Sequence, residues 1–147
     1  MTAVEIVNRL VSVCVDSEKR YRHAAGDVSR DDLEAFFNQQ AEIRKSAADE
    51  LQAERIRMGI DKEESGTFGG LLDRLEMDFS VVMSKGDSGV VEWCRQDAQE
   101  VVGEYEKALA ETLPANLRSI LEHQMGAVRN AVSELERVLR TYGGPRS

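Results

Sequence analysis

The side chains that most often carry out catalysis or bind metals are few and scattered in this sequence of 147 residues. It holds two histidines, His23 and His123, and two cysteines, Cys14 and Cys94. No Cys-x-x-Cys pair and no Cys/His cluster occurs, so a zinc finger or a thioredoxin-like site would lack its residues. No Glu-x-x-His occurs either, although a di-iron site in a helical bundle needs that motif on two helices. We therefore expect both histidines at the surface or rim of the fold.

Polar side chains do interrupt the apolar stripes of the predicted helices. The expected register brings a set of them to a similar depth, namely Glu18, Gln40, Asp97 and Gln124, joined by Tyr21, Arg44 and Tyr105. One interpretation is that these groups hydrogen-bond one another and fix the helix register, because a buried carboxylate without partners is strongly destabilising. The other is an unusual metal or small-ligand site. Two carboxylates and two amides are poor ligands for iron, which favours the first interpretation.

Motifs for other chemistries are incomplete. The glycine-rich stretch Gly66-Thr67-Phe68-Gly69-Gly70 follows no predicted strand and lacks the Gly-Lys-Ser/Thr of a phosphate-binding loop, so we interpret it as a flexible entry to the next helix. No Gly-x-Ser-x-Gly occurs, and neither histidine has an evident Ser or Cys partner, which argues against triad hydrolysis. The residues favour a non-enzymatic protein without a cofactor; a divalent metal in the polar layer is the alternative.

The elements that would position these residues are all helical. Apolar residues recur at intervals of three and four in every segment long enough to judge, which predicts an all-α protein. The stripes predict five helices and a flexible tail (143–147), the helices lying over residues 3–25, 30–58, 68–84, 88–112 and 114–141. Thr2 and Glu5 form a capping box, as do Ser29 and Asp32. Gly26 is expected to end the first helix in the left-handed conformation.

The lengths of the connections predict how these helices are arranged. Residues 26–29 and 112–114 are such short links that the helices on either side must form antiparallel hairpins. The connection over residues 60–86 contains a helix roughly 27 Å long, so it can return along the bundle and make the second and fourth long helices parallel. The sequence thus predicts one domain over residues 1–142, a ferritin-like four-helix bundle of two hairpins joined by a long crossover with an extra helix.

One series of short motifs extends in order over nearly the whole chain: Cys14-Val-Asp16-Ser-Glu18, Tyr21-x-x-Ala24-Ala25, Ala48-x-Glu50-Leu51-Gln52, Gly66, and Glu104-Tyr105-Glu106-Lys107-Ala108-Leu109 before Leu113-Pro114. In order and spacing it resembles an uncharacterised bacterial family of ferritin-like four-helix bundles, a domain of unknown function. The resemblance implies the fold and no catalytic residue, because that family has no assigned activity. Relatives tend to carry a carboxylate where this chain has Ala98, which weakens any inherited metal site.

Charge narrows the choice of partners. The chain has 27 acidic and 19 basic residues, a formal net charge of −8, which disfavours nucleic acid and anionic membranes. Residues 60–113 carry 13 acidic and 5 basic side chains, whereas residues 114–147 carry 3 acidic and 5 basic ones. The acidic region is expected to be a solvated face, or a contact for a basic partner.

The remaining features concern location and assembly. No signal peptide is evident and no apolar run approaches the roughly 20 residues of a membrane span, so we expect a cytoplasmic protein with reduced, buried thiols. Gly103 and Gly126 lie on the outward sides of their helices, where a partner chain or simple tolerance would explain them. The sequence predicts a binding or assembly module with a protein partner or as a homodimer. The alternative is a metal-binding or redox ferritin-like protein.

Overall fold

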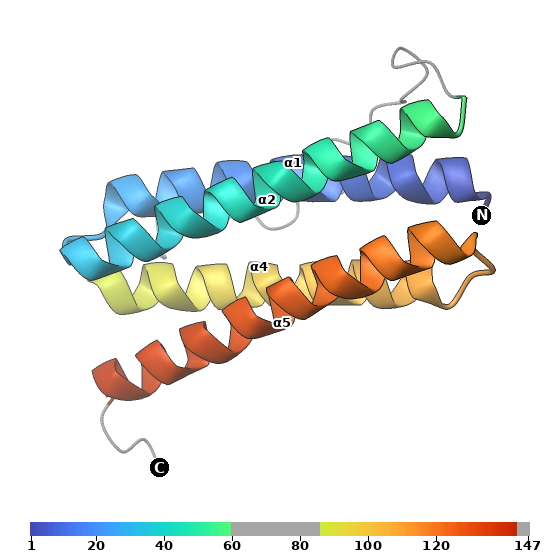
Figure 1. Cartoon of the computed structure of the whole chain (residues 1–147). Helices are drawn as coiled ribbons and strands as arrows, with labels where there is room; N and C mark the ends of the chain where they lie inside the picture. The colour runs from blue at the N-terminus through green and yellow to red at the C-terminus, as the bar shows by residue number, and fades with distance from the viewer. Residues whose placement is uncertain (60–85, 144–147) are drawn as a thin grey trace.

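A computed structural model describes residues 1–59 and 86–143, and the secondary-structure elements of these residues are four helices (Figure 1). They are α1 (Ala3–Asp27), α2 (Asp31–Arg57), α4 (Gly86–Leu109) and α5 (Ala115–Gly143). The expectation of an all-α bundle is confirmed for the described residues, which contain no strand. The helix expected over 68–84 and the Gly66–Gly70 stretch lie outside them, as does the tail expected over 143–147 except for Gly143, which is the last residue of α5 and not part of a tail. None of the described helices is both long and apolar enough to cross a membrane.

The start of α1 follows the sequence closely. The capping box is confirmed: the N–H of Glu5 donates to Thr2 Oγ1 at 3.1 Å, and the N–H of Thr2 donates to Glu5 Oε1 at 2.8 Å. The end differs, because α1 continues through Gly26 to Asp27 and stops at Val28, whose backbone is extended. An extended residue breaks the helix by itself, so Gly26 does not need a positive φ.

The start of α2 also differs from the expected capping box. The residue preceding α2 is Arg30, and no side chain caps the helix. The hydroxyl of Ser29 instead donates to Asp87 Oδ2 at 3.0 Å, and the N–H groups of Ser29 and Arg30 donate to the same carboxylate. The turn between α1 and α2 is therefore tied to the start of α4, a long-range contact that a local motif does not reveal.

The end of α4 is earlier than expected, at Leu109 instead of residue 112. The chain leaves the helix through a turn at Ala110 and Glu111, and Pro114, which restricts Leu113 and cannot donate a backbone hydrogen bond, keeps the helix from resuming before α5. Arg118 from α5 donates to the carbonyl oxygens of Leu109 and Glu111 at 3.1 and 2.9 Å. These bonds satisfy carbonyl groups that the end of α4 leaves unpaired.

The helices form two antiparallel pairs, α1 with α2 and α4 with α5 (Figure 1). Contacts between the pairs show their relative direction. The Ser29–Asp87 bond joins the start of α2 to the start of α4, while Asn116 donates to Glu54 Oε2 at 2.7 Å and joins the end of α2 to the start of α5. Helices α2 and α4 consequently run in the same direction.

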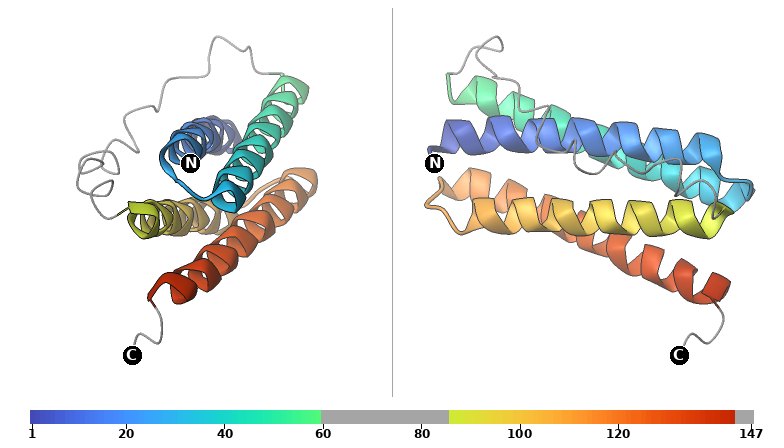
Figure 2. Two further views of the ribbon diagram at one scale, coloured as in Figure 1. Left: turned by 90° about the vertical axis from the view of Figure 1, so that its left-hand side faces the viewer. Right: turned by 180° about the vertical axis from the view of Figure 1, so that it is seen from behind.

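Packing in the bundle is unequal. Helix α1 packs extensively on α2 and also on α4, and α4 packs on α5, whereas α2 and α5 make the fewest contacts among the neighbouring pairs. The C-terminal half of α5 diverges from the other helices (Figure 2). The side between α2 and α5 is therefore the loosest part of the described bundle.

Candidate functional site

A set of buried polar residues lies inside the bundle, with members from all four described helices. We call it the core polar cluster and define it as Cys14, Ser17, Arg20, Tyr21, Gln40, Arg44, Asp97, Tyr105 and Gln124. Each helix presents them on the same stripe as its apolar core residues, and for this reason the side chains converge between the helices.

On the side between α1 and α4, the cluster is organised around Asp97, which is 2% exposed. Its Oδ2 accepts a hydrogen bond from the Ser17 hydroxyl at 3.2 Å, and its Oδ1 lies 3.7 Å from Arg20 Nε. Burial raises the pKa of the Asp97 carboxyl to about 6, although the charges of Arg20 and Arg44 and the bond from Ser17 oppose the rise. Asp97 is therefore poised to titrate close to neutral pH.

A hydrogen-bonded chain crosses the other side of the cluster. The Tyr105 hydroxyl donates to Gln124 Oε1 at 2.7 Å and lies 3.3 Å from Cys14 Sγ. Gln124 Nε2 then donates to Glu50 Oε1 at 2.8 Å and to the Ala47 carbonyl at 3.2 Å. The chain links α1, α4, α5 and α2 in turn, and Gln124, like Asn116 nearer the start of α5, is a polar bridge across the loose side of the bundle.

Arg44 has no such partners. Its side chain is 2% exposed, and neither Nη1 nor Nη2 has a hydrogen-bond acceptor within the described ranges. Gln40, one helical turn earlier, has a buried Oε1 that also lacks a donor there. The Arg44 charge acts to lower the pKa values of Cys14 and Tyr105, but burial outweighs it and raises both. A guanidinium buried without an acceptor is unusual in a folded protein.

Most of the polar residues that the sequence placed in a buried layer lie in the core polar cluster. Gln40, Asp97 and Gln124 are buried in the cluster, and so are Tyr21, Arg44 and Tyr105. Glu18 is not in the cluster: its side chain is 21% exposed and pairs with Arg22 at 3.0 Å. Its neighbour Ser17 takes the inward position, since successive residues on a helix differ by about 100° in direction.

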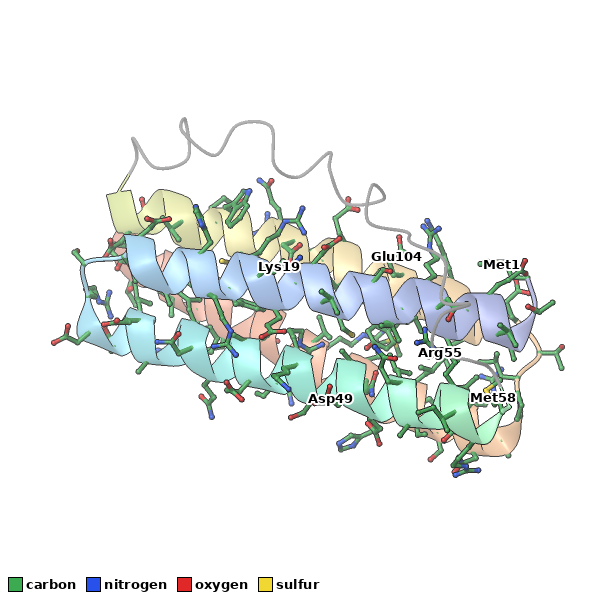
Figure 3. All side chains as sticks on the ribbon, turned by 90° about the horizontal axis from the view of Figure 1, so that it is seen from above. Met1, Lys19, Asp49, Arg55, Met58 and Glu104 are labelled. Atoms are coloured by element: carbon green, nitrogen blue, oxygen red, sulfur yellow. The ribbon has the colours of Figure 1, made fainter. Side chains whose placement is uncertain are left out.

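Two buried arginines were missed by the sequence reasoning. Arg20 lies beside Asp97, and its position three residues after Ser17 on the α1 stripe was the available signal. Arg55 lies between α1 and α2 (Figure 3) and donates to Asn8 Oδ1 at 2.7 Å and Gln52 Oε1 at 2.6 Å. Arg55 lies near the C-terminal end of α2, so we interpret it as a structural contact outside the core polar cluster.

The histidines and cysteines have ordinary surroundings. Both His23 and His123 are exposed, and His23 lies 3.4 Å from Asp27. Both cysteines are free and buried, and burial raises their pKa values, so both are protonated thiols at neutral pH. Across residues 1–59 and 86–143, no three or more His, Cys, Asp or Glu side chains are grouped so that they could hold a metal ion.

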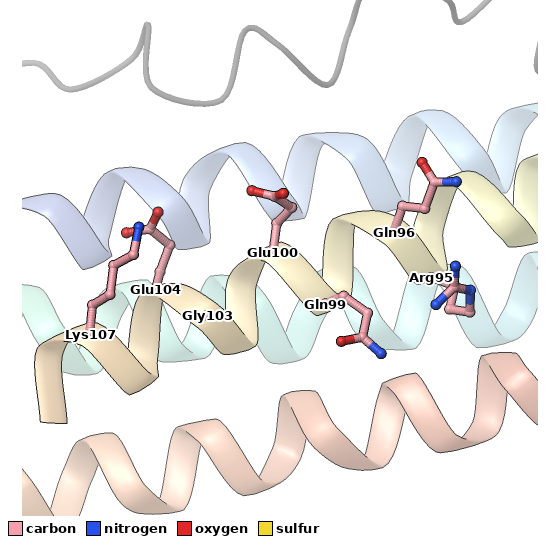
Figure 4. Close-up of a pocket in the computed structure, with 7 residues that line it drawn as sticks. All are labelled: Arg95, Gln96, Gln99, Glu100, Gly103, Glu104 and Lys107. Carbon is pink, nitrogen blue, oxygen red and sulfur yellow. The ribbon is translucent and has the colours of Figure 1, made fainter. Parts of the chain in front are cut away.

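Several hollows mark the surface of the described residues, and one of them reaches the cluster. A groove of about 300 Å³ lies between α2 and α5 and is lined by Gln39, Glu42, Ile43, Arg44, Ser46, Ala47, Glu50, His123, Gln124 and Ala127. A second hollow, of about 460 Å³, is formed by residues of α4 alone (Figure 4). There Gln96, Glu100 and Glu104 project from one flank of the helix, and Glu104 is already bonded to Arg9 at 2.6 Å.

Comparison with known proteins identifies a family and no activity. A family model described as a domain of unknown function, DUF2383, matches residues 2–111, which include all of α1, α2 and α4. Helix α5 lies beyond the matched range. No curated protein matches the chain.

Proposed function

Since the chain belongs to the DUF2383 family, which assigns it no activity, we propose a role from the geometry of the bundle: it is a non-enzymatic binding module. Its binding site is the groove between α2 and α5, which leads from the surface to Arg44 and Gln124 in the core polar cluster. The single observation that carries the proposal is this groove, because it lies where the helices are packed least and where polar groups converge.

We also propose that the bundle is ferritin-like. Two antiparallel pairs, parallel α2 and α4, and a long connection over residues 58–85 between these two helices support this assignment. A cytoplasmic location is supported by two free, buried thiols, which are common where disulfides do not form.

The experiment that tests the binding site uses two small probes, hexanoate and hexanol, with the full chain. We expect at least one probe to shift the amide resonances of Ala47 and Ala127 and to raise Tm by about 2–4 °C at saturating concentration. Ala127→Phe, which fills the groove, should remove both effects. Ala53→Phe, on an exposed position of α2, should leave them unchanged.

The rival function is a metal-binding or redox bundle with an unusual core site. The same thermal measurements with Fe²⁺, Mn²⁺ and Zn²⁺, together with elemental analysis of untagged protein, decide between the two. Stabilisation by a cation and by neither probe would replace the proposed function with the rival. A self-associating module is a third outcome, recognised by a molecular mass in solution that doubles with concentration while both probes fail to bind.

A further inference from the structure

We propose that the groove between α2 and α5 is selective for a small monocarboxylate, whose charged end is bound by the Arg44 guanidinium. The inference rests on the proposed function and names the chemical class of its ligand. It is carried by the burial of Arg44 without an acceptor, by its place in the lining of the groove, and by the charges around the groove.

Within the described residues neither Nη atom of the buried guanidinium makes a hydrogen bond, although the cluster also holds two unpaired acceptor atoms, Gln40 Oε1 and Asp97 Oδ1. Asp97 Oδ2 accepts from Ser17, and Asp97 Oδ1 lies 3.7 Å from Arg20 Nε instead of bonding to Arg44. The Gln124 oxygen already accepts from Tyr105. A carboxylate binds a guanidinium through two parallel hydrogen bonds, and Nη1 and Nη2 are the two nitrogens of Arg44 that lack partners.

The residues that line the groove further restrict the charge and the apolar part of the ligand. Ile43, Ala47 and Ala127 provide an apolar wall suited to a short hydrocarbon chain. Glu42, which pairs with Arg22 at 2.7 Å, and Glu50 lie nearer the solvent, so the mouth disfavours an anion with several charges, such as phosphate, more strongly than one with a single charge. A ligand with one negative charge and a short apolar chain satisfies both conditions.

Gln124 marks how far into the groove the carboxylate of the ligand must extend. Its side chain bridges α5 and α2 through Glu50 and the Ala47 carbonyl, next to the groove. A bound carboxylate at Arg44 therefore lies beside the Gln124 amide, and we expect the side-chain NH₂ resonances of Gln124 to shift on binding.

The test compares hexanoate, hexanol and inorganic phosphate on the full chain at pH 7.5 by calorimetry. We expect hexanoate to bind most tightly and Arg44→Met to weaken it by about tenfold or more, as loss of hydrogen bonds to a charged group implies. The matched control, Arg129→Met, changes an arginine of α5 that is 54% exposed and paired with Glu106, and should have no effect.

Each of the other possible outcomes of this comparison would contradict the inference for a different reason. If hexanol binds as tightly as hexanoate, or Arg44→Met binds hexanoate normally, the groove binds ligands without a carboxylate site and only the proposed function survives. Tighter binding of phosphate would reject a monocarboxylate. If no probe binds, both proposals fail. Should Arg44→Met not fold, the wild-type comparison of hexanoate with hexanol and the Gln124 resonances give the same decision.

Discussion

Asp97 shows how burial and neighbouring charges compete at a single residue. Its pKa of about 6 in the folded protein lies above the value of roughly 3.9 expected for an unfolded chain. The folded state therefore keeps this proton to a higher pH than the unfolded state does. The stability that results is present below about pH 4 and is lost as the pH rises through 6.

We predict that Asp97→Asn removes this pH dependence. Between pH 4 and pH 7, the free energy of unfolding of the wild type should fall relative to that of the variant by about 2 kcal/mol, because the folded pKa lies roughly two units above the unfolded one and the unfolded carboxyl is already about half ionised at pH 4. Urea denaturation of both proteins at several pH values measures the difference, in which the titration of the other carboxylates cancels.

Asp49→Asn is the matched control, because Asp49 is 66% exposed and pairs with Lys45 on the same helix. Its difference from the wild type should stay nearly constant over the same pH range. A constant difference for Asp97→Asn as well would mean that Arg20 and Arg44 keep Asp97 ionised throughout, in contradiction to the dominance of burial.

At the scale of the helices, substitutions of two glycines can show whether these residues affect only helix stability or also a contact with a second chain. Gly126 is exposed in the middle of α5, and a Cβ added there would have no described atom within 4 Å. Gly59, just after α2, has the same free space but a φ of +82°. Added methyl groups are thus tolerated by packing at both positions, while the backbone tolerates one only at Gly126.

We predict that Gly126→Ala raises the free energy of unfolding by about 0.5–1 kcal/mol, because alanine favours the helix. Gly59→Ala should lower it by roughly 1 kcal/mol, because the left-handed conformation is strained for alanine. Thermal denaturation of both variants shows whether each substitution stabilises or destabilises the protein. If Gly126→Ala instead lowered Tm and decreased the mass of an oligomer in solution, the glycine would be a site of close approach by a second copy.

For the molecule as a whole, the unequal packing of the helices has a dynamic consequence. Helix α1 has neighbours on two sides, α2 and α4, whereas α5 depends mainly on α4 and diverges from the bundle toward its end (Figure 2). Local opening is easiest where buried contacts are few. The side between α2 and α5 should therefore open more readily than the interior around α1.

We predict that amide hydrogens of residues 130–143 exchange at least about tenfold faster than those of residues 6–21 under native conditions. Hydrogen exchange followed by mass spectrometry measures both segments in one experiment. Hexanoate should slow exchange in the segments of α2 and α5 that line the groove. Equal, slow exchange of α5 and α1 would show that α5 is held in solution by contacts beyond those described, such as a second copy of the chain.

The sequence by itself determined the helices of the described residues and several of the polar side chains on their buried stripes, although it placed Glu18 there in error and missed Arg20 and Arg55. Helix periodicity and the Thr2–Glu5 capping box depend on residues close together in the chain, and local rules are sufficient for them. Gln40, Asp97, Gln124 and Arg44 could be identified as inward-facing for the same reason.

Only the tertiary structure decided which neighbours those side chains meet. Rotation of a helix by one residue exchanges Ser17 for Glu18 beside Asp97, and this rotation depends on packing between helices. The loose packing between α2 and α5 likewise creates the groove at Arg44, and no local sequence pattern encodes this packing. Periodicity shows that a residue such as Arg44 is buried. Whether a hydrogen-bond acceptor lies beside it depends on residues that are far away in the chain.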